Sequence, residues 1–244
     1  DESAEVIRLC LADFPQVQFF PLSVNSGNCR AFNYALRHAE GDFVIDLAAD
    51  DVLMPNRIAE GVRALTAAGP GYGVDFCDAY WTAEDGSILY RHSDRFPHST
   101  IPQGDVYTEL IERFFICSPA MIFRIEVIRE LDGYDETLAY EDFDFWIRSS
   151  RRWLYHYTPN VLVRKRIVKG SMSQKQFSLF SPQLDSTYRI CEKILALNRS
   201  LSEQKALARR IRYEMRVCLR LFRLQLLLRY GRLLIRNSRM VYPD

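Results

Sequence analysis

The sequence predicts an α/β fold with a helical extension, and three observations lead to that prediction. Over the first 175 residues, stretches with helical apolar spacing alternate with short runs rich in β-branched and aromatic residues. One such run, Phe43 to Leu47, ends in two alanines and the adjacent acids Asp50 and Asp51, as expected of a buried strand that ends at a ligand site. From Leu184 onward the sequence has helical spacing and no further strand-like runs bounded by turn residues. The alternation favours a largely parallel sheet flanked by helices.

The composition is that of an ordinary globular chain. Of the 244 residues, 48% are hydrophobic and 26% are charged, and the net charge of +1 alone argues neither for nor against a polyanionic partner. The six cysteines have no paired metal-type spacing, which favours buried and reduced thiols. No uninterrupted apolar stretch reaches the ~20 residues that a membrane-spanning helix needs.

The first part of the chain predicts helices and strands in alternation. The expected elements are a helix over 4–13, a strand over 17–22, a helix over 34–39, the strand from Phe43 and a helix over 55–68. Between the first strand and the second helix, a polar turn runs from Asn25 to Asn33 and contains Gly27. A glycine-bearing turn that leads into a helix offers free backbone N–H groups to an anion, although many loops share this pattern.

The middle of the chain predicts a second group of strands and short helices. The expected elements are strands over 74–81, 88–91 and 117–124, helices over 106–115 and 125–131, and further strands within 153–163. The irregular segment 94–105 could pass over a site. We expect His92 and His98 to face solvent, because no partner spacing supports a ligand role for either.

The acid pair Asp50 and Asp51 is the first candidate site. Two adjacent carboxylates repel each other unless a cation, a helix N-terminus or solvent relieves them. A metal site at the strand end is one interpretation. The other is that Asp51 caps the helix that Pro55 opens.

A second acidic cluster lies between Glu141 and Arg148. If a helix begins near Glu141, Asp142 and Trp146 share one face at positions i and i+4. Partial loss of water among aromatic residues raises the pKa of a carboxyl group toward that of a useful base. The alternative is an amphipathic helix whose first-turn acids only interact favourably with the helix dipole.

The end of the chain predicts a basic amphipathic helix. Between Lys205 and Arg239 there are eleven Lys or Arg residues and a single acid, Glu214, and apolar residues recur at intervals of three or four. We expect a break at Tyr230-Gly231. Such a helix either lies on an anionic membrane surface, docks onto a partner, or packs on its own domain with a solvated basic face.

Taken in order, these segments resemble the family 2 glycosyltransferases with the GT-A fold, from residue 1 to about Ser173. Several spaced motifs carry the resemblance at once. They are the Asn-x-Gly and Ala-x-Asn motifs at Asn25, Gly27, Ala31 and Asn33, Gly41-Asp42 before a hydrophobic strand, the acid pair Asp50-Asp51, Gly133 to Glu136, and Glu141 to Arg148.

The resemblance implies a Rossmann-like GT-A domain, a nucleotide-diphospho-sugar transferase with a mixed sheet flanked by helices, over residues 1–175. A helical extension follows over residues 176–244. It also implies an inverting enzyme that moves a sugar from a nucleoside-diphosphate donor to a glycan, polysaccharide or lipid-linked acceptor, with Mg²⁺ or Mn²⁺ as cofactor. Cell envelope polysaccharide synthesis is the implied setting, with no nucleic acid partner. The expected location is the cytoplasm, with the inner face of the cell membrane as the alternative.

The resemblance also implies roles for particular residues. Asp142 is the expected base, Glu141 orients the base or the acceptor, and Asp50 is the expected metal ligand, with Asp51 beside it. Trp146 and Phe143 are expected to form a face for an acceptor sugar. The expected donor-binding residues are Asn25, Gly27, Arg30, Asn33, Asp50 and Asp51.

Three departures from the family pattern qualify these expectations. Ala48 stands where members often have the leading acid of the metal motif, which weakens the metal inference. Val168 stands where a histidine is frequent. Asp1-Glu2-Ser3 resembles the tail of a motif that follows two strands and a helix, so we expect an N-terminally truncated, inactive piece of an active parent. The alternative is a non-catalytic sugar-nucleotide or glycan-binding protein on the same scaffold.

Overall fold

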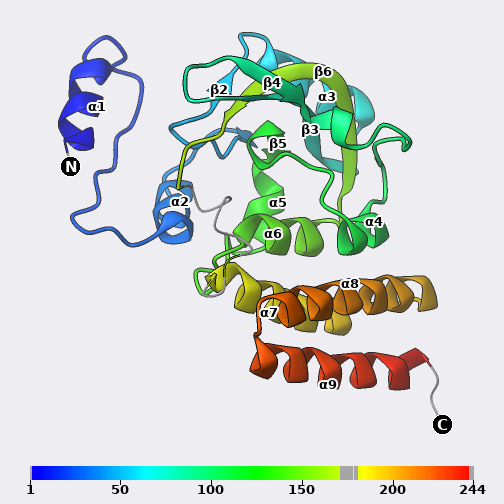
Figure 1. The fold of residues 1–244 in the computed structure, drawn as a ribbon. Coiled ribbons are helices and arrows are strands. Elements are labelled where there is room, and N and C mark those ends of the chain that lie inside the picture. Colours follow the sequence, from blue (N-terminus) through cyan, green and yellow to red (C-terminus); the bar gives the residue numbers. More distant parts are fainter. Residues whose placement is uncertain (1, 171–177, 179–180, 242–244) are drawn as a thin grey trace. The chain divides into compact units, whose positions relative to one another are not determined.

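The computed structural model describes residues 2–170, 178 and 181–241, and it divides into two compact units, Asp1–Glu40 and Gly41–Asp244. The first unit contains helices α1 (Ser3–Leu11) and α2 (Asn28–Leu36) (Figure 1). Residues 17–22 form no strand, so that prediction is wrong. A strand needs a neighbour for its backbone hydrogen bonds, and the described part of this unit provides none.

The second unit is built on a mixed sheet of six strands. They are β1 (Phe43–Val44), β2 (Val52–Leu53), β3 (Tyr72–Thr82), β4 (Ile88–Arg91), β5 (Met121–Arg124) and β6 (Leu154–Arg166). Their order is β1-β5-β3-β6-β2, and β4 pairs with the far end of β3.

The pairing corrects the expectation of a largely parallel sheet. Only β3 and β6 run parallel, and the other four pairs are antiparallel. A parallel pair needs a crossover of a dozen or more residues. The turn between β3 and β4 is far shorter, so this pair is a hairpin. The strand predicted over 43–47 is also shorter than expected, because only Phe43 and Val44 pair with β5.

Helices pack on this sheet and position its loops. They are α3 (Arg57–Ala68), α4 (Tyr107–Glu112), α5 (Ile125–Glu130) and α6 (Glu141–Ser149), with the 3₁₀ turns η1 (His92–Arg95) and η2 (Ser118–Ala120). The helices predicted over 55–68 and 125–131 and the helix start at Glu141 are confirmed. Strand β3 lies at the centre, with residues 73–79 all buried.

A buried polar network fixes α3 on the sheet. Arg57 and Asp75 are both fully buried, and their side chains form an ion pair of 2.8 Å. Arg57 also donates to the carbonyl of Ala120, while the second oxygen of Asp75 accepts from His156 and Thr158. Such a pair is tolerated in a core because nearly all of its polar atoms find partners.

Three helices complete the second unit. Helices α7 (Pro182–Leu197), α8 (Leu201–Arg220) and α9 (Leu224–Val241) stack beside α4 and α6 (Figure 1). The chain turns at Phe222, which has a positive φ of 53°, and Gly231 lies inside α9, so the predicted break at Tyr230-Gly231 is wrong. The turn at Phe222 lets α8 and α9 run antiparallel and pack on each other, and Leu207 of α8 and Leu233 of α9 are both buried.

The predicted boundary near residue 175 falls at residues 171–177, which are outside the described part, and it stays a prediction. No helix in the described ranges has the length and apolar character that a membrane span requires. All six thiols are free, and five are buried as expected, whereas Cys10 is exposed.

Candidate active site

The second unit contains a cavity of about 480 Å³ between the sheet and helix α6. Strands β3 and β6, the turn η1, the segment 114–118 and the first turns of α6 and α7 contribute its walls. The lining residues that carry polar or charged side chains are Trp81, His92, Arg95, Ser118, Tyr140, Glu141, Asp142, Trp146, Lys165 and Gln183. Two residues of the second acidic cluster, Glu141 and Asp142, therefore lie on a cavity.

Asp142 is a cavity carboxyl group whose pKa is raised strongly, which favours its neutral form. It sits in the first turn of α6, half-buried and next to Glu141. Loss of water is the largest cause that raises the pKa of Asp142 to about 7, and the neighbouring Glu141 charge adds to it. A hydrogen bond from Ser118 and the charge of Lys165 oppose the rise. A carboxyl group with a pKa near 7 can accept a proton at neutral pH.

A third carboxyl group, Asp46, belongs to the same electrostatic group, and sequence reasoning missed it. The buried Tyr134 donates a hydrogen bond of 3.1 Å to Asp46. Burial raises the pKa of Asp46, and the charge of Glu141 raises it further against the opposing effect of the Tyr134 bond. Asp46 also raises the pKa of Asp142. The signal in the sequence is an acid inside the otherwise apolar run from Phe43 to Leu47.

The end of β6 supplies a cation to the cavity. Lys165 lines it and lies 5.1 Å from the centre of the Trp81 ring. The backbone N–H of the next residue, Arg166, donates to the Asp51 carboxylate at 2.9 Å. Burial raises the pKa of Asp51 despite this bond and the nearby positive charges. The basic run 164–169 was visible in the sequence, but its pairing with the acid pair was not.

His92 is a cavity residue and not a solvent-facing one, which corrects the expectation. Its side chain is 4% exposed, and Nδ1 accepts from the Trp81 indole at 3.2 Å. Nε2 therefore carries the proton and donates to the carbonyl of Phe115 at 2.9 Å. Burial lowers the pKa of His92 to about 4, so the ring is neutral at pH 7. His98 is exposed, as expected.

The two predicted acceptor-binding residues lie in different places. Trp146 lines the cavity, but its ring is largely buried and its N–H points to the sulfur of Met121 at 3.1 Å. Phe143 is fully buried, edge-on to Phe114, with Arg210 over its ring. A side chain without exposed surface offers no face to a sugar, so the structure assigns Phe143 to the core and not to the cavity wall.

Four of the predicted donor-binding residues lie in the first unit. Asn25 accepts a hydrogen bond of 3.1 Å from the N–H of Gly27, whose φ of +85° favours glycine, and α2 starts directly after it. Asn25 and Gly27 line a concave region of about 700 Å³ in this unit. Arg30 is exposed and Asn33 is buried, and both belong to α2.

The acid pair offers little to a metal ion by itself. Asp50 is half-buried, one oxygen of Asp51 is already bonded to the Arg166 N–H, and position 48 is an alanine. Among the described residues, no group of three or more His, Cys, Asp or Glu side chains could hold a metal ion. Asp50 is therefore the more available protein ligand for a metal at this place, where oxygens of a bound ligand would have to complete the site.

Comparison with protein families decides what kind of chain this is. The model of glycosyl transferase family 2 matches residues 1–132, more than half of the sequence. The chain belongs to glycosyl transferase family 2. Two curated relatives are similar to it at low identity. An uncharacterized glycosyltransferase of Rickettsia bellii is 22% identical over 177 residues, covering 71% of this chain and 25% of the relative. One from Methanocaldococcus jannaschii is 22% identical over 151 residues, covering 60% and 49%.

Solved structures show the fold of this family 2 chain. TarS of S. aureus, residues 1–349 in complex with UDP-GlcNAc, has a TM-score of 0.65 at 17% identity, covering 85% of this chain and 58% of that one. The mannosyltransferase PcManGT of Pyrobaculum calidifontis, in complex with GDP-Man and Mn²⁺, has a TM-score of 0.60 at 16% identity, covering 98% and 63%. The predicted GT-A fold is confirmed. The chain spans between a quarter and two thirds of the length of these relatives.

Proposed function

We propose that the chain carries the catalytic centre of an inverting glycosyltransferase, which moves a sugar from a nucleoside-diphosphate donor to an acceptor hydroxyl. The observation that carries this proposal is Asp142, a cavity carboxyl group whose pKa is raised to about 7. The donors held by the two solved relatives, UDP-GlcNAc and GDP-Man, support a sugar nucleotide as the donor class.

In this mechanism Asp142 is the general base. The acceptor oxygen attacks the anomeric carbon as the bond from that carbon to the diphosphate oxygen breaks, and the hydroxyl proton passes to the Asp142 carboxylate. Glu141 orients the acceptor and helps to keep the pKa of Asp142 high. Lys165 supplies positive charge in the same cavity, where diphosphate charge develops.

Asp50 is the protein ligand that we propose for a divalent metal, with donor oxygens completing the site. When bound, Mg²⁺ or Mn²⁺ would neutralise charge on the departing diphosphate. The Mn²⁺ present with GDP-Man in PcManGT supports this class of cofactor. The single carboxylate leads to a clear expectation: Asp50→Asn should reduce the metal dependence of donor binding, whereas Asp51→Asn, whose amide oxygen can still accept from the Arg166 N–H, should change it much less.

The direct test is a scan of sugar nucleotides with the full-length protein, with Mn²⁺ or EDTA, in which donor consumption and product configuration are followed by NMR. Turnover with inversion at the anomeric carbon supports the proposal. Donor binding without hydrolysis or transfer, for every donor and acceptor class tried, would contradict it. That result would favour the second candidate, a non-catalytic sugar-nucleotide or glycan-binding protein, for which Ala48 is the specific observation.

We further propose that helices α8 and α9 bring the protein to the anionic, cytoplasmic face of the cell membrane, where a lipid-linked or envelope glycan acceptor would lie. Exposed basic side chains follow one face of α8 at intervals of three or four, namely Lys205, Arg209, Arg212, Arg216 and Arg220. Phe222, at the turn into α9, is 83% exposed, and Leu228 is 64% exposed. Exposed cations beside apolar side chains suit a bilayer surface.

Vesicle flotation tests this second proposal. The full-length protein should float with vesicles that contain anionic lipid and stay behind with purely zwitterionic ones. Replacing Arg212 and Arg216 by Gln together with Phe222→Ser should abolish flotation, while Arg63→Gln on the exposed side of α3 should not. Equal flotation of all variants, or none by the wild type at low salt, would contradict membrane docking through this surface.

A further inference from the structure

Helix α7 contacts the segment that leads into the α6 N-terminus through three side chains on one of its faces. Ser186, Arg189 and Lys193 are spaced at i, i+3 and i+7, which places them on the same side of a helix. Their partners follow one another in the opposite direction along the chain. The Ser186 hydroxyl accepts from the N–H of Ala139 at 2.8 Å, and Arg189 donates to the carbonyl of Thr137 at 2.8 Å.

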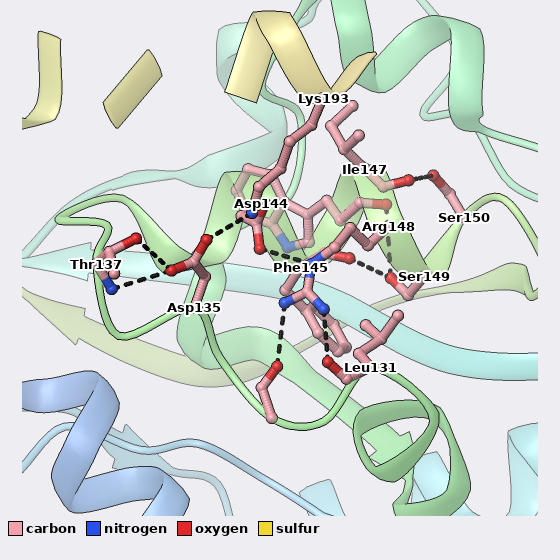
Figure 2. Close-up of polar contacts among 12 residues, drawn as sticks. Leu131, Asp135, Thr137, Asp144, Phe145, Ile147, Arg148, Ser149, Ser150 and Lys193 are labelled. Atoms are coloured by element: carbon pink, nitrogen blue, oxygen red, sulfur yellow. Dashed lines mark hydrogen bonds and ion pairs between the residues drawn. The ribbon is translucent and has the colours of Figure 1, made fainter. Parts of the chain in front are cut away.

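Lys193 is the strongest of these contacts, because its ammonium group joins two acids. It lies 2.7 Å from one oxygen of Asp135 and 2.6 Å from one oxygen of Asp144, as Figure 2 shows. Burial alone would raise the pKa of Asp135, but the hydrogen bonds from Lys193 and Thr137 outweigh it and lower that pKa. Charge-assisted contacts of this length are the stronger class of hydrogen bond.

Asp144 connects Lys193 to the body of α6. Its side chain is almost fully buried, and its second oxygen accepts from Nε of Arg148 at 2.6 Å. Arg148 then donates to the carbonyls of Leu131 at 2.8 Å and Gly133 at 3.0 Å (Figure 2). Together, these contacts hold the segment 131–140 near both of its ends. The turn at the start of this segment contains Asp132 and Gly133, which both have positive φ.

This segment ends at the cavity. Ala139 and Tyr140 line it, and the next two residues are Glu141 and Asp142. The first turn of α7 reaches the same cavity through Gln183, one helical turn before Ser186. A helix from the C-terminal region thus contacts both the cavity and the segment that delivers its carboxyl groups.

We propose that Ser186, Arg189 and Lys193 of α7 are positioning residues, which hold the segment 135–140 and thereby fix Asp142 against the substrates. The C-terminal helical region is then part of the catalytic architecture and not a separate appendage. The inference rests on the proposed role of Asp142 as base. Displacing a catalytic group by about 1 Å costs on the order of 100-fold in rate, so loss of one anchor has a kinetic signature.

The test compares Lys193→Met with Lys193→Arg and with the matched control Glu192→Gln, in the full-length protein. Glu192 is the adjacent residue, but it faces away and contacts Tyr188 and Arg236 instead. Lys193→Met should lower kcat by about tenfold or more, with a nearly unchanged donor KM, and Lys193→Arg should restore most of the loss. Glu192→Gln should stay within about twofold of the wild type.

Hydrogen exchange of the backbone N–H groups of residues 135–142 gives a second readout, which does not depend on turnover. Lys193→Met should raise exchange there by about tenfold while β3 stays protected. If the wild type transfers no sugar, the proposed function fails, but the exchange result still decides whether Lys193 holds the segment 135–140 in place. Should Lys193→Met fold poorly, Ser186→Ala removes one acceptor and should act in the same direction more weakly. The proposal would be overturned if the variants kept the kcat and the hydrogen exchange of the wild type. It would also be overturned if kcat fell while hydrogen exchange rose equally throughout the core.

Discussion

Glu141 raises the pKa of both Asp46 and Asp142, and Asp46 raises that of Asp142 as well. Such coupling means that a neutral substitution of one acid favours ionisation of the others. Because a base must be ionised to accept a proton, turnover should rise with pH through the pKa of Asp142, about 7. The acidic limb of the pH profile therefore reports on the charges around it.

Removing the Asp46 charge should move that limb to lower pH. In Asp46→Asn one like charge disappears, the ionised form of Asp142 becomes easier to reach, and its pKa falls. The measurement is kcat/KM against pH, with Glu141→Gln as a comparison that should shift the limb further, since Glu141 has the larger effect on Asp142. A limb that stays in place in both variants would show that Asp142 does not control it.

Lys165→Met should act in the opposite direction. The positive charge lowers the pKa of Asp142 in the wild type, so its removal should raise that pKa and move the limb to higher pH. The donor KM should also rise, by about tenfold, because a diphosphate loses a favourable charge in the cavity. Lys165→Arg, which keeps the charge, serves as the control. In Lys165→Met, an acidic limb that moves to lower pH, or an unchanged donor KM, would contradict this role.

At the scale of elements, α3 packs on the sheet through a glycine. A Cβ at Gly61 would lie 2.5 Å from both an Arg57 nitrogen and an Ile122 methyl group. Gly61→Ala should therefore lower the free energy of unfolding by about 1–3 kcal/mol through overpacking, although alanine is the better helix former. The measurement is denaturant unfolding followed by circular dichroism.

Gly231 in α9 is the matched control. A Cβ there meets nothing within 4 Å, so Gly231→Ala should raise the free energy of unfolding by about 0.5–1 kcal/mol. Equal effects of the two substitutions would show that packing at Gly61 is looser than the structure indicates.

The elements themselves were predictable where their signals are local. The α6 start at Glu141, the helix α3 and the hairpin of β3 with β4 follow from residue spacing and turn residues, and all three form. The sheet order did not follow, because pairing β3 with both β5 and β6 depends on contacts between residues far apart in sequence. The break between α8 and α9 was predicted at the wrong place because Gly231 suggested it. The apolar side chains that the two helices bury against each other place the break before Leu224 instead.

The site was predictable to the same extent. Glu141 and Asp142 could be expected at one place because one short motif contains both, and both line the cavity. Asp46, His92 and Lys165 come from three distant segments, and only the folded sheet brings them near the cavity. Phe143 was predicted to face a sugar but is fully buried. The spacing of aromatic residues on a helix does not reveal which of them the core covers.

At the scale of the whole molecule, the two compact units differ in how much core they contain. Apart from Cys29, the buried hydrophobic residues of the described chain lie in the second unit. A piece that spans residues 41–244 should therefore unfold cooperatively by itself, as seen by calorimetry. A piece without a thermal transition would contradict this assignment.

The central claim is that Asp142 is the base of a glycosyl transfer, and Asp142→Asn tests it most directly. Turnover and donor affinity should be measured together, in the full-length protein with the donor and metal that give the highest wild-type rate. We predict a loss of turnover of at least about 100-fold with donor affinity essentially unchanged, since the amide cannot accept the proton. Wild-type turnover in Asp142→Asn would contradict the account and assign the base elsewhere in the cavity.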